Sequence, residues 1–202
     1  MYLPKHFAET DVAEMHALMR AHPLATLVSD GPDGLNADHI PLLLADGKLQ
    51  GHVARANPVW KNGQAGGEVL AIFHGHDSYI SPSGYATKAE HGKVVPTWNY
   101  TAVHAWGHLR VIDDPTWVFA QISALTAANE AGLRRPWAVT DAPADYMEKM
   151  LGAIVGIEIT ITRLLGKWKV SQNQPPENQA SLIAALAAHG DPMADLIGRR
   201  RQ

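Results

Sequence analysis

Cysteine is absent from this sequence of 202 residues. Its absence excludes disulfide bonds, thiol redox chemistry, cysteine nucleophiles and cysteine-ligated zinc or iron–sulfur centres. Any redox chemistry must therefore come from a bound cofactor.

The sequence also lacks long hydrophobic runs and an excess of positive charge. No run approaches the roughly 18 apolar residues that span a bilayer, and the start, MYLPKHFAETD, does not resemble a signal peptide. We therefore expect a cytoplasmic protein without membrane contact. The net charge of −3 gives no general attraction for nucleic acid. The one basic run, Arg199 to Arg201, is expected to be a solvated, frayed terminus.

The hydrophobic fraction of 46% and the charged fraction of 18% are typical of a globular chain, and we expect one domain over residues 1–202. Asp11 and Glu14 have capping-box spacing at the start of a helix predicted over 11–21. Hydrophobic alternation and turn signals such as DGPDG and ADG then predict strands over 24–29, 35–44, 48–54, 68–75, 79–81 and 95–112.

The second half changes character. Asp114 and Pro115 open a helical segment over about 114–154, a strand follows over 156–173, and a helix over about 177–189 ends at Gly190. This order predicts a mainly β, α+β protein, an antiparallel barrel with flanking helices. A parallel nucleotide-binding fold is disfavoured, because strands and helices do not alternate and G-x-G-x-x-G is absent.

A candidate phosphate site lies in GHVARANPVW, residues 51–60. His52, Arg55 and Asn57 come where a strand ends, and a guanidinium with an amide can hold phosphate oxygens. Alternatively, Arg55 is a solvated loop cation and Asn57 caps the turn before Pro58.

Two aromatic and polar stretches, KVVPTWNY and GKWKVSQNQ, predict one wall of a ligand pocket. Pro96 ends regular pairing, so that Trp98 and Asn99 can face a ligand. In the second stretch, Ser171 and Gln172 can pair with the edge of a heteroaromatic ring. The alternative is a strand that runs into an ordinary polar turn.

Other motifs carry less chemistry. His74 and His76 provide only two metal ligands, so we predict no metal site. Ser81 and Ser83 precede His91, but G-x-S-x-G is absent, which disfavours hydrolysis. We therefore assign no catalytic residue.

Several long motifs in order resemble the PaiB family, known as FMN-binding negative transcriptional regulators. They are MYLPKHFAE, HPLATLVS, LNADHIPLLL, GHVARANPVW, YISPSGYATKAEHGKVVPTWNY, PADYMEKMLGAIVGIEI and GKWKVSQN. The resemblance implies a split β-barrel related to pyridoxamine phosphate oxidase, and a homodimer with FMN sites between subunits.

The resemblance also implies the cofactor-binding residues. The FMN phosphate would be held by His39, His52, Arg55 and Asn57. Thr97, Trp98 and Asn99 would line the ring pocket with Lys93 nearby, and Lys169, Ser171 and Gln172 would approach from the partner subunit. Gly84 stands where the family has a bulky aromatic residue and His76 where it has proline, which predicts a wider pocket wall or weaker flavin stacking.

The function we expect is that of a flavin-dependent redox or regulatory protein, with an FMN-dependent oxidoreductase as its enzymatic form. One alternative is a DNA-binding repressor without catalysis, although no helix-turn-helix with a basic face is visible. The other is a haem-binding split barrel, because the 11 histidines permit an axial ligand.

Overall fold

The computed structural model describes residues 1–32, 34–63 and 67–200. Asp33, from the predicted DGPDG turn, lies outside the described residues, as do residues 64–66 of the loop before the 68–75 strand. Arg201 and Gln202 also lie outside them. Within the described ranges, no helix combines the length and the apolar character needed to cross a membrane.

The elements follow the predicted order of strands and helices. The strands are β1 Ala8–Glu9, β2 Leu24–Gly31, β3 Gly34–Pro41, β4 Leu43–Ala45, β5 Lys48–Ala54, β6 Glu68–Ile80, β7 Thr97–Ile112 and β8 Ile154–Lys169. The α-helices are α1 Val12–Ala21, α2 Val59–Gly63, α3 Lys88–His91, α4 Pro115–Glu130, α5 Ala144–Gly152, α6 Pro176–Ala187 and α7 Met193–Gly198. The 3-10 helices are η1 Lys5–Phe7, η2 Pro82–Gly84 and η3 Val139–Asp141.

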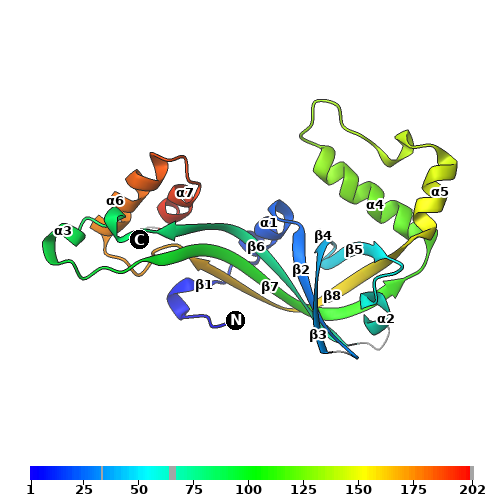
Figure 1. Ribbon diagram of the computed structural model, residues 1–202, viewed down its shortest axis with the longest axis horizontal. Helices are drawn as coiled ribbons and strands as arrows, with labels where there is room; N and C mark the ends of the chain where they lie inside the picture. The colour runs from blue at the N-terminus through cyan, green and yellow to red at the C-terminus, as the bar shows by residue number, and fades with distance from the viewer. Residues whose placement is uncertain (33, 64–66, 201–202) are drawn as a thin grey trace. The chain divides into compact units, whose positions relative to one another are not determined.

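The strands form one sheet of eight in the order β3-β2-β6-β7-β8-β5-β4, with β1 paired to β8 (Figure 1). The registers of β2 with β3 and of β5 with β8 are antiparallel. The predicted α+β class, an antiparallel split barrel with flanking helices, is confirmed. Two strand predictions differ in detail, because the 35–44 strand divides at Leu42 and β6 joins the two predicted over 68–75 and 79–81.

The chain, expected as one domain, divides into two compact units by its internal contacts. Unit 1 comprises residues 1–21, 74–103 and 165–202, and unit 2 comprises residues 22–73 and 104–164. The long strands β6, β7 and β8 each contribute residues to both units.

Unit 2 contains β2 to β5 and the helical segment. Alternate residues of β5 are buried, including Leu49 and Val53, as expected for strands with one face against a core. Gly107 allows β7 to approach β8, since a Cβ there would lie 2.4 Å from the Thr160 carbonyl oxygen. The predicted helix start is confirmed, because the Asp114 side chain accepts a hydrogen bond from the Thr116 backbone N–H.

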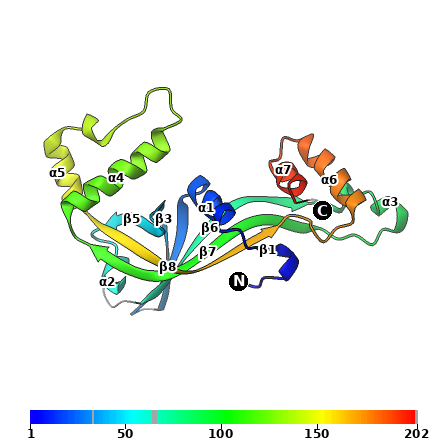
Figure 2. The same ribbon diagram turned by 180° about the vertical axis from the view of Figure 1, so that it is seen from behind.

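Unit 1 gathers both ends of the chain. β1 pairs with β8, and α6 packs against α7 (Figure 2). The predicted cap at Gly190 is consistent with its positive φ of 67°. Helix α7 was not predicted, and the expectation for the basic run that follows it is wrong for one residue. Arg200, expected to be solvated, forms an ion pair with the buried Glu9 carboxylate.

A buried carboxylate holds three strands of unit 2 together. The Glu158 side chain on β8 is 5% exposed and accepts hydrogen bonds from Lys48, Gln50 and Arg110, which lie on β5 and β7. Burial alone would raise the pKa of Glu158, but these hydrogen bonds and the charge of Arg110 lower it below its ordinary value. The charged form therefore stabilises the folded state.

We predict that Glu158→Gln lowers the free energy of unfolding by about 2 kcal/mol at pH 7, since the paired cations lose their buried partner. A depressed pKa stabilises above the unfolded-state value and loses that effect as pH falls through the folded-state value. The difference from wild type should thus shrink below about pH 4.5. Urea unfolding at several pH values measures it, with exposed Glu148→Gln as control. A constant difference across pH would contradict the assignment.

Candidate functional site

The predicted phosphate residues all lie in unit 2, and Arg55 is engaged within the chain. Its guanidinium donates to both carboxylate oxygens of Asp113, at 2.9 and 2.6 Å, and to the carbonyl oxygens of Gly152 and Ile154. The hydrogen bonds between them raise the pKa of Arg55 and lower that of Asp113. These bonds use four of the five guanidinium N–H groups, so bidentate contact with a phosphate would require displacement of the Asp113 carboxylate.

The other three predicted phosphate residues also have partners. The His52 ring pairs with the Gln121 amide at 2.9 Å, and the His39 ring with the Thr26 hydroxyl at 3.1 Å. Asn57 donates to Asp38, and its side-chain oxygen accepts from Val59, which makes it the turn cap considered as the alternative. Within the described part of the chain, no hydrogen bond joins these three side chains or Arg55 to one another. Their role at a phosphate stays a prediction.

In unit 1 the two predicted wall segments come together, because β7 and β8 are neighbours in the sheet. The Lys169 ammonium donates to the Thr97 hydroxyl and to the Trp98 carbonyl oxygen, and Asn99 donates to the Ser171 hydroxyl at 2.8 Å. We call these five residues the β7–β8 cluster. The resemblance placed Lys169 and Ser171 on a partner subunit, but here they contact β7 of their own chain.

Burial affects the protonation of one member of the β7–β8 cluster, Lys169. Burial, together with the charge of Lys167, lowers the pKa of Lys169 below that of a free lysine. Asn99 is 1% exposed and Ser171 is 2% exposed, so their hydrogen bond is made out of solvent. The cluster offers ammonium, hydroxyl and amide groups side by side, on residues that are buried or half-buried apart from Trp98.

Ser171 has a backbone conformation that is unusual for a residue with a side chain. Its φ is 62°, in the left-handed region. The Gln179 amide donates to the carbonyl oxygens of Ser171 and Gln174, and the Gln174 N–H donates to that of Ser171. The surrounding bonds fix the strained turn, as is common at ligand sites.

One cavity is lined by members of the β7–β8 cluster, and a second shares Tyr85, Val95 and Gln174 with it. The first, of about 150 Å³, is lined by Thr97, Asn99, Lys169 and Ser171 among others. The second, of about 230 Å³, includes Lys93, which places a further predicted residue nearby.

Tyr85 is the residue that the sequence analysis missed. It is 4% exposed, and its hydroxyl has no hydrogen-bond partner among the described residues. Burial raises the pKa of Tyr85, and the side-chain interaction with the nearby Ser171 hydroxyl, which lies outside hydrogen-bond geometry, opposes that rise. A buried hydroxyl without a hydrogen-bond partner lowers the stability of the fold. Because Tyr85 lies on the wall of both cavities, its hydroxyl points to a ligand that accepts a hydrogen bond from it.

The remaining predicted residues lie at the margins. Trp98 is 55% exposed and meets the Tyr79 ring edge to face, with the ring centres 5.8 Å apart. The Gln172 amide bonds the backbone of Trp168 and Val170, and lines a different cavity of unit 1.

The two departures from the family pattern have structural roles. A Cβ at Gly84 would lie 3.1 Å from the Leu182 side chain, and the Gly84 carbonyl oxygen accepts from Ser181. The position therefore packs against α6. His76 bonds Asp191 at 2.8 Å, and the described residues contain no group of three or more side chains suited to a metal.

Comparison with known proteins identifies the family. A family model described as "Putative FMN-binding domain" matches residues 1–163. The chain belongs to this family. The matched segment includes Tyr85, Thr97 and Asn99, and ends before Lys169 and Ser171.

The PaiB resemblance is also confirmed. The "Protease synthase and sporulation protein PAI 2" of Bacillus subtilis is 28% identical, over 96% of this chain and 93% of that protein. An uncharacterised protein of Emericella nidulans is 34% identical, over 92% of this chain and 90% of its own length. This chain is thus a PaiB-type member of the FMN-binding-domain family.

Solved structures share the fold at low identity. The FAD and haem binding protein of Mycobacterium smegmatis has a TM-score of 0.59 and 17% identity, over 80% of this chain and 73% of its own. The flavocytochrome Anf3 of Azotobacter vinelandii has a TM-score of 0.60 and 14% identity, over 83% of this chain and 72% of its own. They support the fold alone.

The residues of unit 1 fit the polar edge of a flavin ring. Flavin rings present carbonyl oxygens and ring nitrogens, and the β7–β8 cluster with Tyr85 supplies an ammonium, hydroxyls and an amide. The unpaired Tyr85 hydroxyl is the observation that calls for such a partner. Each cavity alone is smaller than the roughly 300 Å³ of an ordinary ligand site, so a flavin would need both.

We predict that Arg55→Ala weakens FMN binding roughly tenfold or more, because a charge-assisted phosphate contact is lost. Asp113→Asn is the matched variant, since it frees the guanidinium and should leave affinity equal or tighter. Fluorescence titration of FMN measures both dissociation constants. Equal weakening by the two variants would show that the ion pair only supports the fold.

Proposed function

We propose that the protein binds FMN through the β7–β8 cluster and Tyr85, and that it acts as a flavin-dependent redox or regulatory protein. The observation that carries this is the buried, unpaired Tyr85 hydroxyl on the shared wall of two cavities, in a chain of the FMN-binding-domain family. When bound, FMN supplies hydride or single-electron transfer.

The chain's own residues would bind and orient the ring. Lys169 places a positive charge beside Thr97, where electron density on a reduced ring would be stabilised. Asn99 and Ser171, both buried, offer hydrogen bonds that water does not compete for. Trp98, half-exposed, can cover the ring from the solvent side.

The remaining parts of the proposal rest on the resemblance to the PaiB family. It includes a cytoplasmic homodimer with flavin sites between subunits, and a phosphate held by His39, His52, Arg55 and Asn57. It also includes a link to negative transcriptional regulation, for which the relative's sporulation name is the support. A flavin-dependent reaction or a protein partner could provide that link without direct DNA contact.

The first test is a visible absorption spectrum of the purified protein, repeated after adding FMN and, separately, haemin. Flavin bands that survive desalting are expected. A haem spectrum with no flavin retained would instead support the haem-binding alternative. If neither cofactor binds, and a defined operator is bound with a steep salt dependence, the repressor alternative holds.

The sharper prediction concerns the Tyr85 hydroxyl. Tyr85→Phe should raise the FMN dissociation constant about fivefold to tenfold, because one hydrogen bond to the ring is lost. Without FMN, the same change should leave the free energy of unfolding unchanged or raise it by up to about 1 kcal/mol, since a buried unpaired hydroxyl is removed.

Tyr146→Phe is the matched control, because Tyr146 is 54% exposed and lies in unit 2. FMN titration and urea unfolding are measured for all three proteins. Unchanged FMN affinity in Tyr85→Phe, or a clear loss of stability without FMN, would remove Tyr85 from the site.

A further inference from the structure

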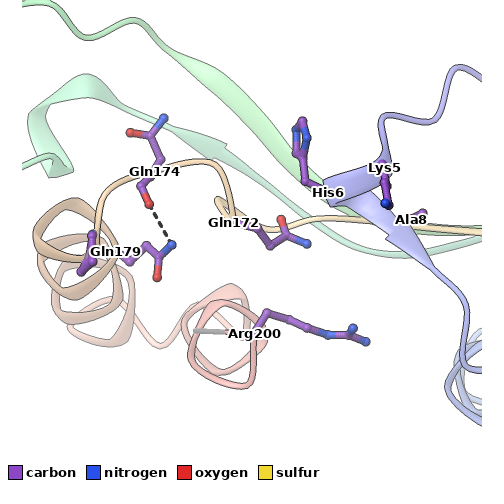
Figure 3. Close-up of a pocket in the computed structure, with 8 residues that line it drawn as sticks. Lys5, His6, Ala8, Gln172, Gln174, Gln179 and Arg200 are labelled. Atoms are coloured by element: carbon purple, nitrogen blue, oxygen red, sulfur yellow. Dashed lines mark hydrogen bonds between the residues drawn. The ribbon is translucent and has the colours of Figure 1, made fainter. Parts of the chain in front are cut away.

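A larger cavity of unit 1 is lined by no member of the β7–β8 cluster, although it shares Gln174 with the two cavities described above. Its volume is about 430 Å³, within the range of small-molecule sites. Figure 3 shows it between the N-terminal segment, the turn after β8 and the C-terminal helices. We call it the terminal cavity. Its polar lining residues are Lys5, His6, Gln172, Gln174, Gln179 and Arg200.

The lining is basic. Lys5 and Arg200 are cations, His6 becomes one when protonated, and no aspartate or glutamate lines the cavity. One acidic group, Glu9, pairs with Arg200 at the margin. Within the part of the chain that the structure describes, no hydrogen bond or ion pair engages the Lys5 ammonium. The cavity therefore retains an uncompensated positive charge that would attract an anion.

Arg200 is oriented for this role. Its Nη2 donates to the Glu9 carboxylate, which is 4% exposed and also accepts from the Asp11 N–H. Nε and Nη1 have no partner among the described residues. Figure 3 shows the side chain, which follows the end of α7, reaching toward Lys5 and Ala8. The Nη1 group of an arginine fixed in this way is free to donate to an oxygen of an oxyanion.

The wall opposite the cations is rigid. The Gln172 amide accepts from the Val170 N–H and donates to the Trp168 carbonyl oxygen. Gln179, 8% exposed, fixes the turn by donating to Ser171 and Gln174. Little side-chain entropy remains to be lost when a ligand binds, which favours binding.

We propose that the terminal cavity binds a small organic anion through a carboxylate or phosphate group, with Lys5 and Arg200 contacting its oxygens. Gln172 offers its second amide N–H to the rest of the ligand. This proposal does not rest on flavin binding, because neither of its two anion-contacting residues, Lys5 and Arg200, is assigned to FMN.

The test is a titration of the full-length protein, as purified, with inorganic phosphate and separately with citrate, at constant ionic strength. Backbone amide NMR shifts of residues 5–8 and 172–174 report the terminal cavity. Saturable shifts with a dissociation constant on the order of 1 mM are expected for at least one probe. Which probe binds tells whether the site prefers phosphate or carboxylate.

Lys5→Gln removes the free cation at an exposed position, so the fold should be retained. Binding should weaken at least fivefold, while Lys149→Gln, an exposed change in unit 2, should leave it unchanged. Shifts that do not saturate, or that are equal in the three proteins, would overturn the proposal. Failure of both probes to bind wild type would do the same.

Discussion

The pairing of β7 with β8 is the constraint on which both units depend. Each strand has 16 residues, and the two are neighbours in the sheet. In unit 2 this pairing brings Arg110 to the buried carboxylate of Glu158. In unit 1 it brings Lys169 to Thr97. One ladder thus positions a stabilising ion cluster and a candidate cofactor site.

The polar groups of the two units differ in how completely they are paired. Both carboxylate oxygens of Glu158 accept hydrogen bonds from partners of its own unit, as expected of a group that stabilises a fold. Tyr85 is buried without such a partner, and the terminal cavity keeps a cation free. Incomplete pairing of this kind is typical of groups that complete their contacts with a ligand.

The sequence predicted much of this architecture, because strands and helices leave local signals. Alternation, the Asp114 cap and Gly190 all lie close to the elements they define. The resemblance named the residues of the β7–β8 cluster as cofactor-binding. No local pattern could predict that Lys169 contacts Thr97 of the same chain, since the two are 72 residues apart. The pairs Arg55 with Asp113 and Arg200 with Glu9 join residues 58 and 191 apart, and so were out of reach.

Tyr85 was missed for a different physical reason. In the stretch SPSGYATK it looks like any loop residue, and only the folded chain shows that α6 and the turn after β8 bury it. The sequence pointed instead to the neighbouring Gly84, which stands where the family has an aromatic residue. In the structure that glycine makes room for Leu182, so an aromatic there would meet the packed helix.

The division of the β7–β8 cluster along the chain has a consequence for biosynthesis. Asn99 is synthesised before the chain is half made, but its partner Ser171 follows 72 residues later in a chain of 202. A nascent chain can pair β3, β2, β6 and β7 while Lys169 and Ser171 are still missing. Holding a flavin by this cluster is therefore a property of the nearly complete polypeptide, and truncated chains lack it.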